Sequence, residues 1–332
     1  MLAVIILGCT AAIGAVAQQQ RVIYLEGDPQ LRRGASSVML NFGEELRGGD
    51  SIRTGRADLV ELQQGSGNTI TIHPDTTFSV NEISVDGETE RQLTASRGSA
   101  SFRFTQPGGA RRVGTATTTA GIRGTEFTMF AAADGAAFYV VESGLVEVES
   151  QGTRVEVAAN QAVEVAPNQP PGEVVSWIGR TLDFSDWNGE RLDAFLEDPQ
   201  GTLQGLTEQL FRFARRMEAT EIEYRSSRAQ LDAARAYMRE LQQQGSDEFE
   251  DYRDTIVPPY VRTTSNLFLN TRYFALSALS LRRHVVGSLY VQAKARVLLE
   301  PDSRWAEYME DHSYFVQQFE TRIVPLLEDD DI

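Results

Sequence analysis

The two halves of the chain differ in the period of their apolar residues. From Val22 to about Val175, short runs of valine, isoleucine, threonine and aromatic residues alternate with polar ones and are separated by Gly, Asp-Gly or Asn. The densest such stretch is Thr115–Val165. Alternating β-branched runs broken by turn residues are typical of short consecutive strands. This half is therefore predicted to be all β, as a sandwich, barrel or solenoid, since no fixed repeat selects one of them.

From Gly189 onward the pattern predicts helices. Apolar or small residues recur at alternating spacings of three and four, at Leu203, Leu206, Leu210, Phe213, Met217, Thr220, Tyr224, Ser227, Leu231, Ala234, Met238 and Leu241. This heptad seam predicts one long helix with a narrow packing stripe, which ends near Gly245. A second helical stretch runs from about Tyr260 to Leu299. We expect the two to form an antiparallel hairpin; an intermolecular coiled coil is the alternative.

The expected fold class is therefore α+β with segregated domains, an all-β domain followed by an all-α hairpin or bundle. The predicted β domain covers 18–175 and the helical domain 189–328. A linker or covering segment, 176–188, contains Trp177 and Trp187, which are expected to pack at the domain edge. The residues 329–332 are expected to form an acidic, solvated tail.

Five motifs in the first half occur in the order that is typical of one family. The first is Gly49-Asp50-Ser51-Ile52-Arg53-Thr54-Gly55, and the most specific is Ile122-Arg123-Gly124-Thr125-Glu126-Phe127. The others are Ile70–Thr76, Leu93–Phe102 and Val141–Val148. In this order they resemble the motifs of FecR domains, over roughly Val22 to Val165.

The resemblance implies a coiled, solenoid-like β-structure. The best-known FecR proteins are inner-membrane regulators that pass a signal from an outer-membrane receptor to a cytoplasmic sigma factor. This chain departs from that plan, because its apolar segment lies at the start and a helical region replaces the receptor-contacting lobe. The resemblance therefore implies an extracytoplasmic binding or assembly module here. Its motif residues are expected to have structural roles, as turn glycines, turn hydrogen bonds and an Arg123 ion pair: Asp50, Thr54, Gly55, Arg123, Gly124, Thr125 and Gly144.

The apolar stretch Leu2–Ala17 is too short to span a membrane as a helix. It ends in Ala15-Val16-Ala17, and small residues at these spacings fit cleavage by a signal peptidase. The alternatives are lipidation of Cys9, the only cysteine, and an uncleaved anchor. Either cleavage or lipidation predicts a periplasmic or secreted protein, in the second case with a lipid anchor in the inner or outer membrane.

The formal net charge of -16 disfavours non-specific binding to nucleic acid. The charge is unevenly spread, because no acidic residue lies between Asp254 and Glu300 while the flanking helical stretches are rich in Glu and Asp. We expect a basic central helix joined to acidic neighbours by ion pairs. The alternative is a membrane-surface helix whose lipid-facing residues would be Leu267, Phe268, Phe274, Leu281 and Val285.

Residues that could carry chemistry are few. His73 precedes Pro74 and is expected to lie in a turn, and no HExxH, CxxC, GxSxG or Walker pattern occurs. One helical stretch contains a group that could hold a divalent cation, although a solvated helix face is the preferred interpretation: Glu307, Glu310, Asp311 and His312. We predict no catalytic residue, metal site or cofactor.

The function expected from the sequence is that of a non-catalytic envelope module that binds a protein or a glycan, in signalling or as a scaffold. One alternative is an assembly protein that forms homo-oligomers through the helical domain. The other is a polysaccharide-acting enzyme, which would use Asp183 and Asp186 beside Trp187.

Overall fold

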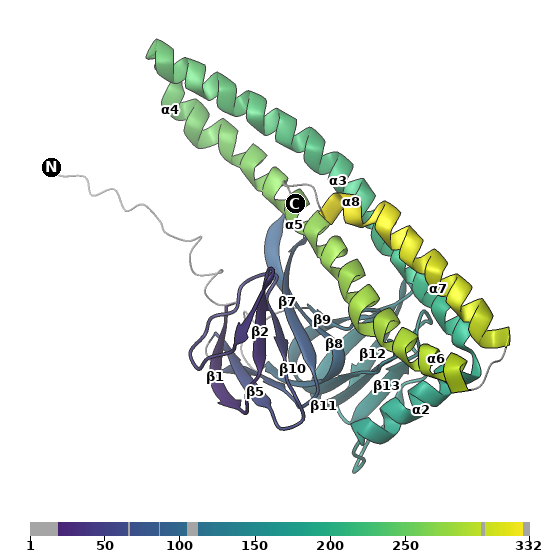
Figure 1. Cartoon of the computed structure of the whole chain (residues 1–332). Helices are drawn as coiled ribbons and strands as arrows, with labels where there is room; N and C mark the ends of the chain where they lie inside the picture. The colour runs from purple at the N-terminus through teal and green to yellow at the C-terminus, as the bar shows by residue number, and fades with distance from the viewer. Residues whose placement is uncertain (1–18, 66, 86, 105–111, 300–302, 328–332) are drawn as a thin grey trace. The chain divides into compact units, whose positions relative to one another are not determined.

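The computed structural model describes residues 19–65, 67–85, 87–104, 112–299 and 303–327, without the side chain of Arg123. The described strands lie within 20–176 and the described helices within 184–327 (Figure 1). The segregated α+β class predicted from the sequence is confirmed. The predictions about Cys9, about cleavage after Ala17 and about the acidic tail concern residues outside the described ranges.

In the described part of the chain, 14 strands form one hydrogen-bonded sheet. They are β1 (Gln20–Glu26), β2 (Gln30–Arg33), β3 (Ser36–Met39), β4 (Ser51–Arg53), β5 (Leu59–Gln64), β6 (Asn68–Ile72), β7 (Thr77–Val85), β8 (Glu88–Phe104), β9 (Arg112–Gly114), β10 (Thr119–Ala131), β11 (Ala137–Ser150), β12 (Thr153–Ala158), β13 (Gln161–Val165) and β14 (Val175–Ser176). The main path is β14-β13-β11-β10-β9-β8-β7-β4-β2-β3, and β6, β5 and β1 branch from β8. The pairing of β8 with β9 is parallel, whereas β10 pairs antiparallel with β8, β9 and β11.

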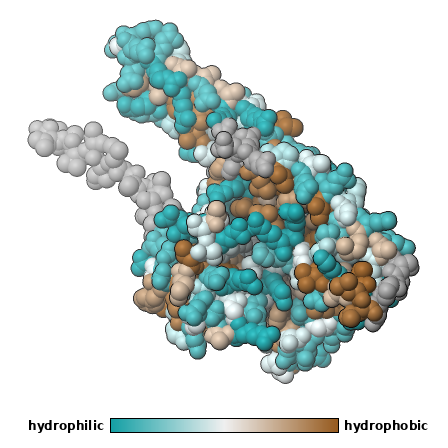
Figure 2. All heavy atoms as spheres, viewed as in Figure 1, coloured by the Kyte–Doolittle hydropathy of each residue, from teal (hydrophilic) through white to brown (hydrophobic). Residues whose placement is uncertain are grey.

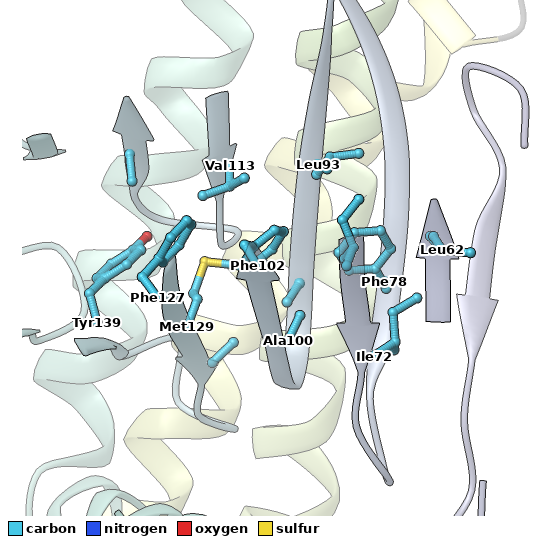
Figure 3. Close-up of a cluster of buried hydrophobic side chains, with 14 of the residues drawn as sticks. Leu62, Ile72, Phe78, Leu93, Ala100, Phe102, Val113, Phe127, Met129 and Tyr139 are labelled. Carbon is cyan, nitrogen blue, oxygen red and sulfur yellow. The ribbon is translucent and has the colours of Figure 1, made fainter. Parts of the chain in front are cut away.

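The core of the β-structure is formed by the apolar positions of the alternating pattern. Figure 3 shows buried side chains that point toward one another, from Leu62 of β5 to Tyr139 of β11. Phe102 of β8 stacks on Phe127 of β10 with 4.8 Å between ring centroids. Tyr139 is fully buried, and its hydroxyl shares a 2.6 Å hydrogen bond with the hydroxyl of Thr118. Successive side chains point to opposite faces of a strand, so the period-two pattern places one apolar set in this core.

The chain divides into two compact units that are not contiguous in sequence. The strand unit runs from the first described residue to Val80 and also holds Arg91–Ala131 and Ala137–Phe184. The helical unit holds Ser185 onward together with two short pieces, Asn81–Glu90 and Ala132–Ala136. Both pieces connect consecutive strands, since the first includes the β7–β8 turn and the second the β10–β11 turn.

The helical unit is built around one long helix. The helices are α2 (Phe184–Glu197), α3 (Pro199–Gln244), α4 (Phe249–Asp251), α5 (Val257–Ser280), α6 (Gly287–Leu299), α7 (Ser303–Arg322) and α8 (Val324–Leu327), with π-helical turns η1 (Tyr252–Ile256) and η2 (Leu281–Val286). The carboxylate of Asp198 accepts a hydrogen bond from the Gly201 N–H at the start of α3. Gly245 ends α3 in the left-handed conformation, which glycine adopts without a steric cost.

Helices α3 and α5 form an antiparallel hairpin within the chain. The hydroxyl of Ser227 bonds that of Thr264 (2.8 Å), and the hydroxyl of Thr271 donates to that of Thr220 (3.0 Å). A residue further along α3 therefore pairs with a residue nearer the start of α5, as in an antiparallel pair. Helical structure begins earlier than predicted, at Phe184 rather than Gly189. Pro258 and Pro259 lie in the first turn of α5, which directly follows the π-helical turn η1.

None of the helices in the described residues is both long and apolar enough to cross a bilayer.

Candidate functional site

The first family motif forms a turn that is organised by one buried carboxylate. Asp50 accepts hydrogen bonds from the Arg47 N–H (2.8 Å) and from the Nη2 of Arg33 (2.7 Å). The Nε of Arg33 also lies 3.0 Å from the Asp50 Oδ1, and its Nη1 lies 3.1 Å from Glu44. These bonds to Asp50 and Glu44 raise the pKa of Arg33. Asp50 therefore fixes the approach to β4, and its acceptor atoms are already used within the protein.

Thr54 begins a ladder of hydroxyl hydrogen bonds that links the segment after β4 to the β6–β7 connection and to strand β8. Its Oγ1 donates to the carbonyl of His73 (2.7 Å) and accepts from the Thr76 N–H (2.8 Å). The Oγ1 of Thr76 in turn accepts from the Ser99 N–H (3.0 Å). Next to Thr54, the Gly55 N–H donates to the carboxylate of Asp58 (2.7 Å). The polar atoms of this motif thus satisfy buried backbone groups.

The most specific motif is a β-bulge in the long strand β10. The register with β11 shifts between Arg123 and Glu126, and Gly124 has a φ of 60°. On β11, Gly144 has a φ of 84°, and a Cβ placed there would lie 2.4 Å from the Gly124 carbonyl. Glycine is therefore required at 144 for both conformation and space. The bulge lets β10 pair with β9 before it and with β8 after it.

Two other predicted residues lie at this bulge. The hydroxyl of Thr125 is buried and has no hydrogen-bond partner among the described residues. The ion pair expected of Arg123 falls on a side chain that the structure does not describe, so it stays a prediction.

A polar row crosses the opposite face of the sheet, and the sequence pattern did not reveal it. The Nε2 of His73 lies 2.8 Å from the hydroxyl of Ser101, which lies 2.9 Å from that of Thr128. Thr128 donates to Glu142 over 3.3 Å. Burial lowers the pKa of His73 and raises that of Glu142. In this row the hydroxyl of Ser101 contacts His73 on one side and the hydroxyl of Thr128 on the other. Period-two spacing places these residues on one face but cannot show that they touch.

The acidic stretch of α7 is not assembled into a metal site. His312 stacks on Tyr290 of α6 with 4.2 Å between centroids, and burial lowers the pKa of His312. One carboxylate oxygen of Asp311 is buried and has no hydrogen-bond partner in the part of the chain that the structure describes. Within the described ranges, no group of three or more His, Cys, Asp or Glu side chains could hold a metal ion.

The residues proposed for a glycosidase have separate roles. Asp186 lies in the first turn of α2, where a carboxylate interacts favourably with the helix dipole, while Asp183 precedes the helix. Trp187 is buried in the helical unit. Trp177 packs edge-on against Phe138 of the strand unit, with 5.0 Å between centroids. Both tryptophans therefore pack against the protein, as expected for residues at a domain edge.

Side chains of the helices hold the two strand-derived pieces of the helical unit. Asn270 of α5 accepts from the Ser84 N–H (2.7 Å), and Asn266 donates to the Gly87 carbonyl (3.1 Å). In the second piece, Asp134 is buried and pairs with Arg191 of α2 at 2.8 Å. Sequence reasoning missed all of these contacts. The Asp134-Gly135 pair was recognisable only as a turn signal, and the asparagines of α5 carried no signal of a partner.

Comparison with known proteins agrees with the motif order. The model of the family described as FecR protein matches residues 50–162. Two solved structures, both of a proposed anti-sigma factor from Parabacteroides distasonis ATCC 8503, show limited similarity. One is 19% identical over 38% of this chain and 57% of that chain, with a TM-score of 0.31. The other is 18% identical over 45% and 64%, with a TM-score of 0.32.

In both cases the chain spans less than two thirds of the other protein. A search of curated proteins found no match. The family assignment thus rests on the matched segment and on the turns and bulge that its motif residues build. Residues 50–162 match the FecR family, and the helical part of the chain lies outside that match.

Proposed function

We propose that this is a non-catalytic, extracytoplasmic FecR-domain protein in which the α3–α5 hairpin docks on another protein of the cell envelope. The observation that carries the proposal is the outer part of the hairpin. Helix α7 ends beside α3 at Glu218, which pairs with Arg322 over 2.8 Å. Beyond that point three large apolar side chains are exposed, at Ile222, Tyr237 and Ile256. Exposed apolar residues along a narrow two-helix arm suit docking on a partner.

The hairpin also offers a way to transmit docking. Asn266 and Asn270, on the same α5 that forms the arm, bind backbone groups of the 81–90 piece. A displacement of α5 along its axis would break these two hydrogen bonds or carry the piece with it. In this proposal a signalling role follows from the contacts between α5 and the β7–β8 turn. The FecR domain supplies the platform that carries that turn.

The assembly alternative is less well supported by the packing. The seam that would join copies is largely buried inside the chain, including Leu203, Leu210, Leu231 and Leu241. Oligomerisation through it would require the hairpin to open. The outer apolar residues are not part of this seam, so they remain available to a different protein.

The test is photo-crosslinking in intact cells with a crosslinkable residue at Ile222 or Tyr237. The control is Asp232, which is also exposed on α3 but lies about 80° around the helix from Ile222 and about 140° from Tyr237. We expect both test positions to capture one recurrent envelope protein that position 232 captures weakly. Adducts only between copies of this chain would favour the assembly alternative. A purified chain that hydrolyses a cell-wall polymer would refute a non-catalytic role.

The location is tested separately, by fusing the chain to a phosphatase that is active only outside the cytoplasm. Activity of the fusion is expected, and an inactive but stable fusion would contradict the extracytoplasmic assignment.

A further inference from the structure

Helix α6 is apolar on two opposite faces. Its inner face buries Leu289 and Ala293. The outer face carries Val291, Leu298 and Leu299, which are 64%, 77% and 74% exposed. Ala295, one turn after Val291, is exposed on the same side. At 100° per residue, these four lie within one stripe opposite the buried pair. We call Val291, Ala295, Leu298 and Leu299 the outer α6 stripe.

A surface helix normally has one apolar stripe, which faces the core, so a second apolar stripe on the outer side is unusual. Figure 2 shows a hydrophobic area over the end of α6, on the same side of the molecule as that helix in Figure 1. The membrane-surface alternative from the sequence placed Leu281 and Val285 toward lipid. That placement is wrong, because both side chains are buried in η2. The surface actually left uncovered is one helical segment further along the chain.

The charged residues of α6 itself are basic, Lys294 and Arg296, although Glu300 follows its last residue in the sequence. No acidic residue occurs from Thr255 to Leu299, and the whole chain carries a net charge of -16. Lys294, the only lysine, is exposed on α6 between Val291 and Leu298, with its Nζ 5.9 Å from the ring of Tyr290. Arg282, one helical segment earlier, lies over Phe319 and 3.8 Å from Glu320. A basic side chain beside exposed leucines is the arrangement by which interfacial helices bind anionic lipids.

The size of the stripe argues against a second copy as the occupant. Three large side chains would bury on the order of 300 Å². A stable interface buries about 800 Å² on each partner, so contact through this stripe alone would be weak. Self-association would also place two helices of the same basic segment together. Insertion into a lipid surface needs no complementary area and places lipid phosphates near Lys294.

We propose that the outer α6 stripe inserts into the headgroup region of an anionic membrane surface, with Lys294 at the phosphates. This inference is independent of the docking role of the α3–α5 hairpin, which uses other residues. It places α6 on the membrane, not across it.

The experiment uses the full chain with Cys9→Ser, so that a single introduced cysteine carries an environment-sensitive fluorophore. The test position is Leu298→Cys, with Val291→Cys as a second position should the first not fold. The matched control is Ile222→Cys, an exposed apolar residue (68%) on α3. Vesicles consist of phosphatidylcholine alone or of an equimolar mixture with phosphatidylglycerol. A shift of emission to the blue, with quenching by lipid-borne quenchers, reports insertion at the labelled residue.

We expect the labels at 298 and 291 to shift with the anionic vesicles only, and the label at 222 to remain unchanged. Lys294→Gln should weaken the vesicle affinity about fivefold, and Leu299→Glu about tenfold or more.

The proposal is overturned if neither label on α6 shifts with anionic vesicles, or if the shift is equal with neutral vesicles. An equal shift at 222 would also overturn it, because the response would not be local to α6. A shift that appears on raising the protein concentration without lipid would assign the stripe to a second copy instead.

Discussion

Replacing Asp50 tests whether the family motif holds the fold together. Its side chain is 2% exposed and accepts hydrogen bonds from the guanidinium of Arg33 and from the Arg47 N–H. Hydrogen bonds to charged groups contribute about 1.5–3 kcal/mol each, and breaking a buried pair costs about 3–5 kcal/mol. Arg33 keeps a one-third exposed side chain, so water and Glu44 would partly compensate its charge. We therefore expect Asp50→Ala to cost about 3 kcal/mol.

Asp50→Asn should cost less, about 1–2 kcal/mol, because the amide oxygen can still accept the Arg47 N–H while the charge is lost. The control is Glu45→Ala, which removes an ion pair to Arg21 whose side chains are 59% and 45% exposed. Exposed pairs contribute about 0–1 kcal/mol, so this control should change little.

The assay is amide hydrogen exchange of the segment 30–54, which reports the opening of this region without requiring two-state unfolding of both units. A loss of about 3 kcal/mol corresponds to exchange that is faster by roughly a hundredfold. The reasoning is refuted if Asp50→Ala and Glu45→Ala accelerate exchange to the same small extent. In that case the buried carboxylate would contribute no more than a surface pair.

Three further predictions follow from other contacts. Gly144→Ala should destabilise the strand unit by about 2–4 kcal/mol, because its Cβ would overlap the Gly124 carbonyl. Gly152→Ala, also at positive φ but with open space around it, should cost only about 1 kcal/mol, and thermal midpoints that do not separate the two would contradict the steric argument. Burial lowers the pKa of His73 below its ordinary 6.5, so the unfolded chain binds the proton more readily. Stability should therefore be unaffected by His73 above about pH 6.5 and fall as the pH drops below it. His73→Gln should reduce that fall in thermal midpoints measured from about pH 7.5 to about pH 5. If the midpoint of this variant falls with pH as steeply as that of the unchanged chain, His73 is not the cause. Ser227→Ala and Thr264→Val should each cost about 1 kcal/mol by leaving one buried hydroxyl unpaired, whereas the double variant should be nearly neutral. If the two single variants shift the urea midpoint by amounts that sum to the shift of the double variant, the two hydroxyls are not coupled.

Residue periodicity was enough to predict the fold class and the two long helices. It could do so because a strand and a helix bury residues at different spacings. Gly245 likewise predicted the end of α3 from local chemistry alone. In contrast, the seam pattern included Thr220 and Ser227 without indicating a partner for either, yet both bond hydroxyls of α5. A single-helix pattern cannot show which residue faces a seam position.

The sequence alone could not reveal the long-range hydrogen-bond partners, for the same reason. The ion pair of Asp50 with Arg33 joins the start of β4 to the end of β2. The row from His73 to Glu142 joins strands that are far apart in the chain. The pieces 81–90 and 132–136 of the helical unit have Asn270 and Arg191 as hydrogen-bond partners. None of these side chains differs in type from an ordinary solvated residue. Their roles come from the strand register and from helix packing, which only the folded chain defines.

The account depends most on the α3–α5 hairpin being closed within one chain, which leaves the outer residues free for another protein. The most direct measurement is disulfide formation in the full chain with Cys9→Ser, Thr220→Cys and Thr271→Cys, at the pair whose hydroxyls lie 3.0 Å apart. The product is sized under denaturing, non-reducing conditions. We predict a disulfide-closed product of monomer mass at all protein concentrations. A disulfide-linked dimer would contradict the account, because the two helices would then pair between copies.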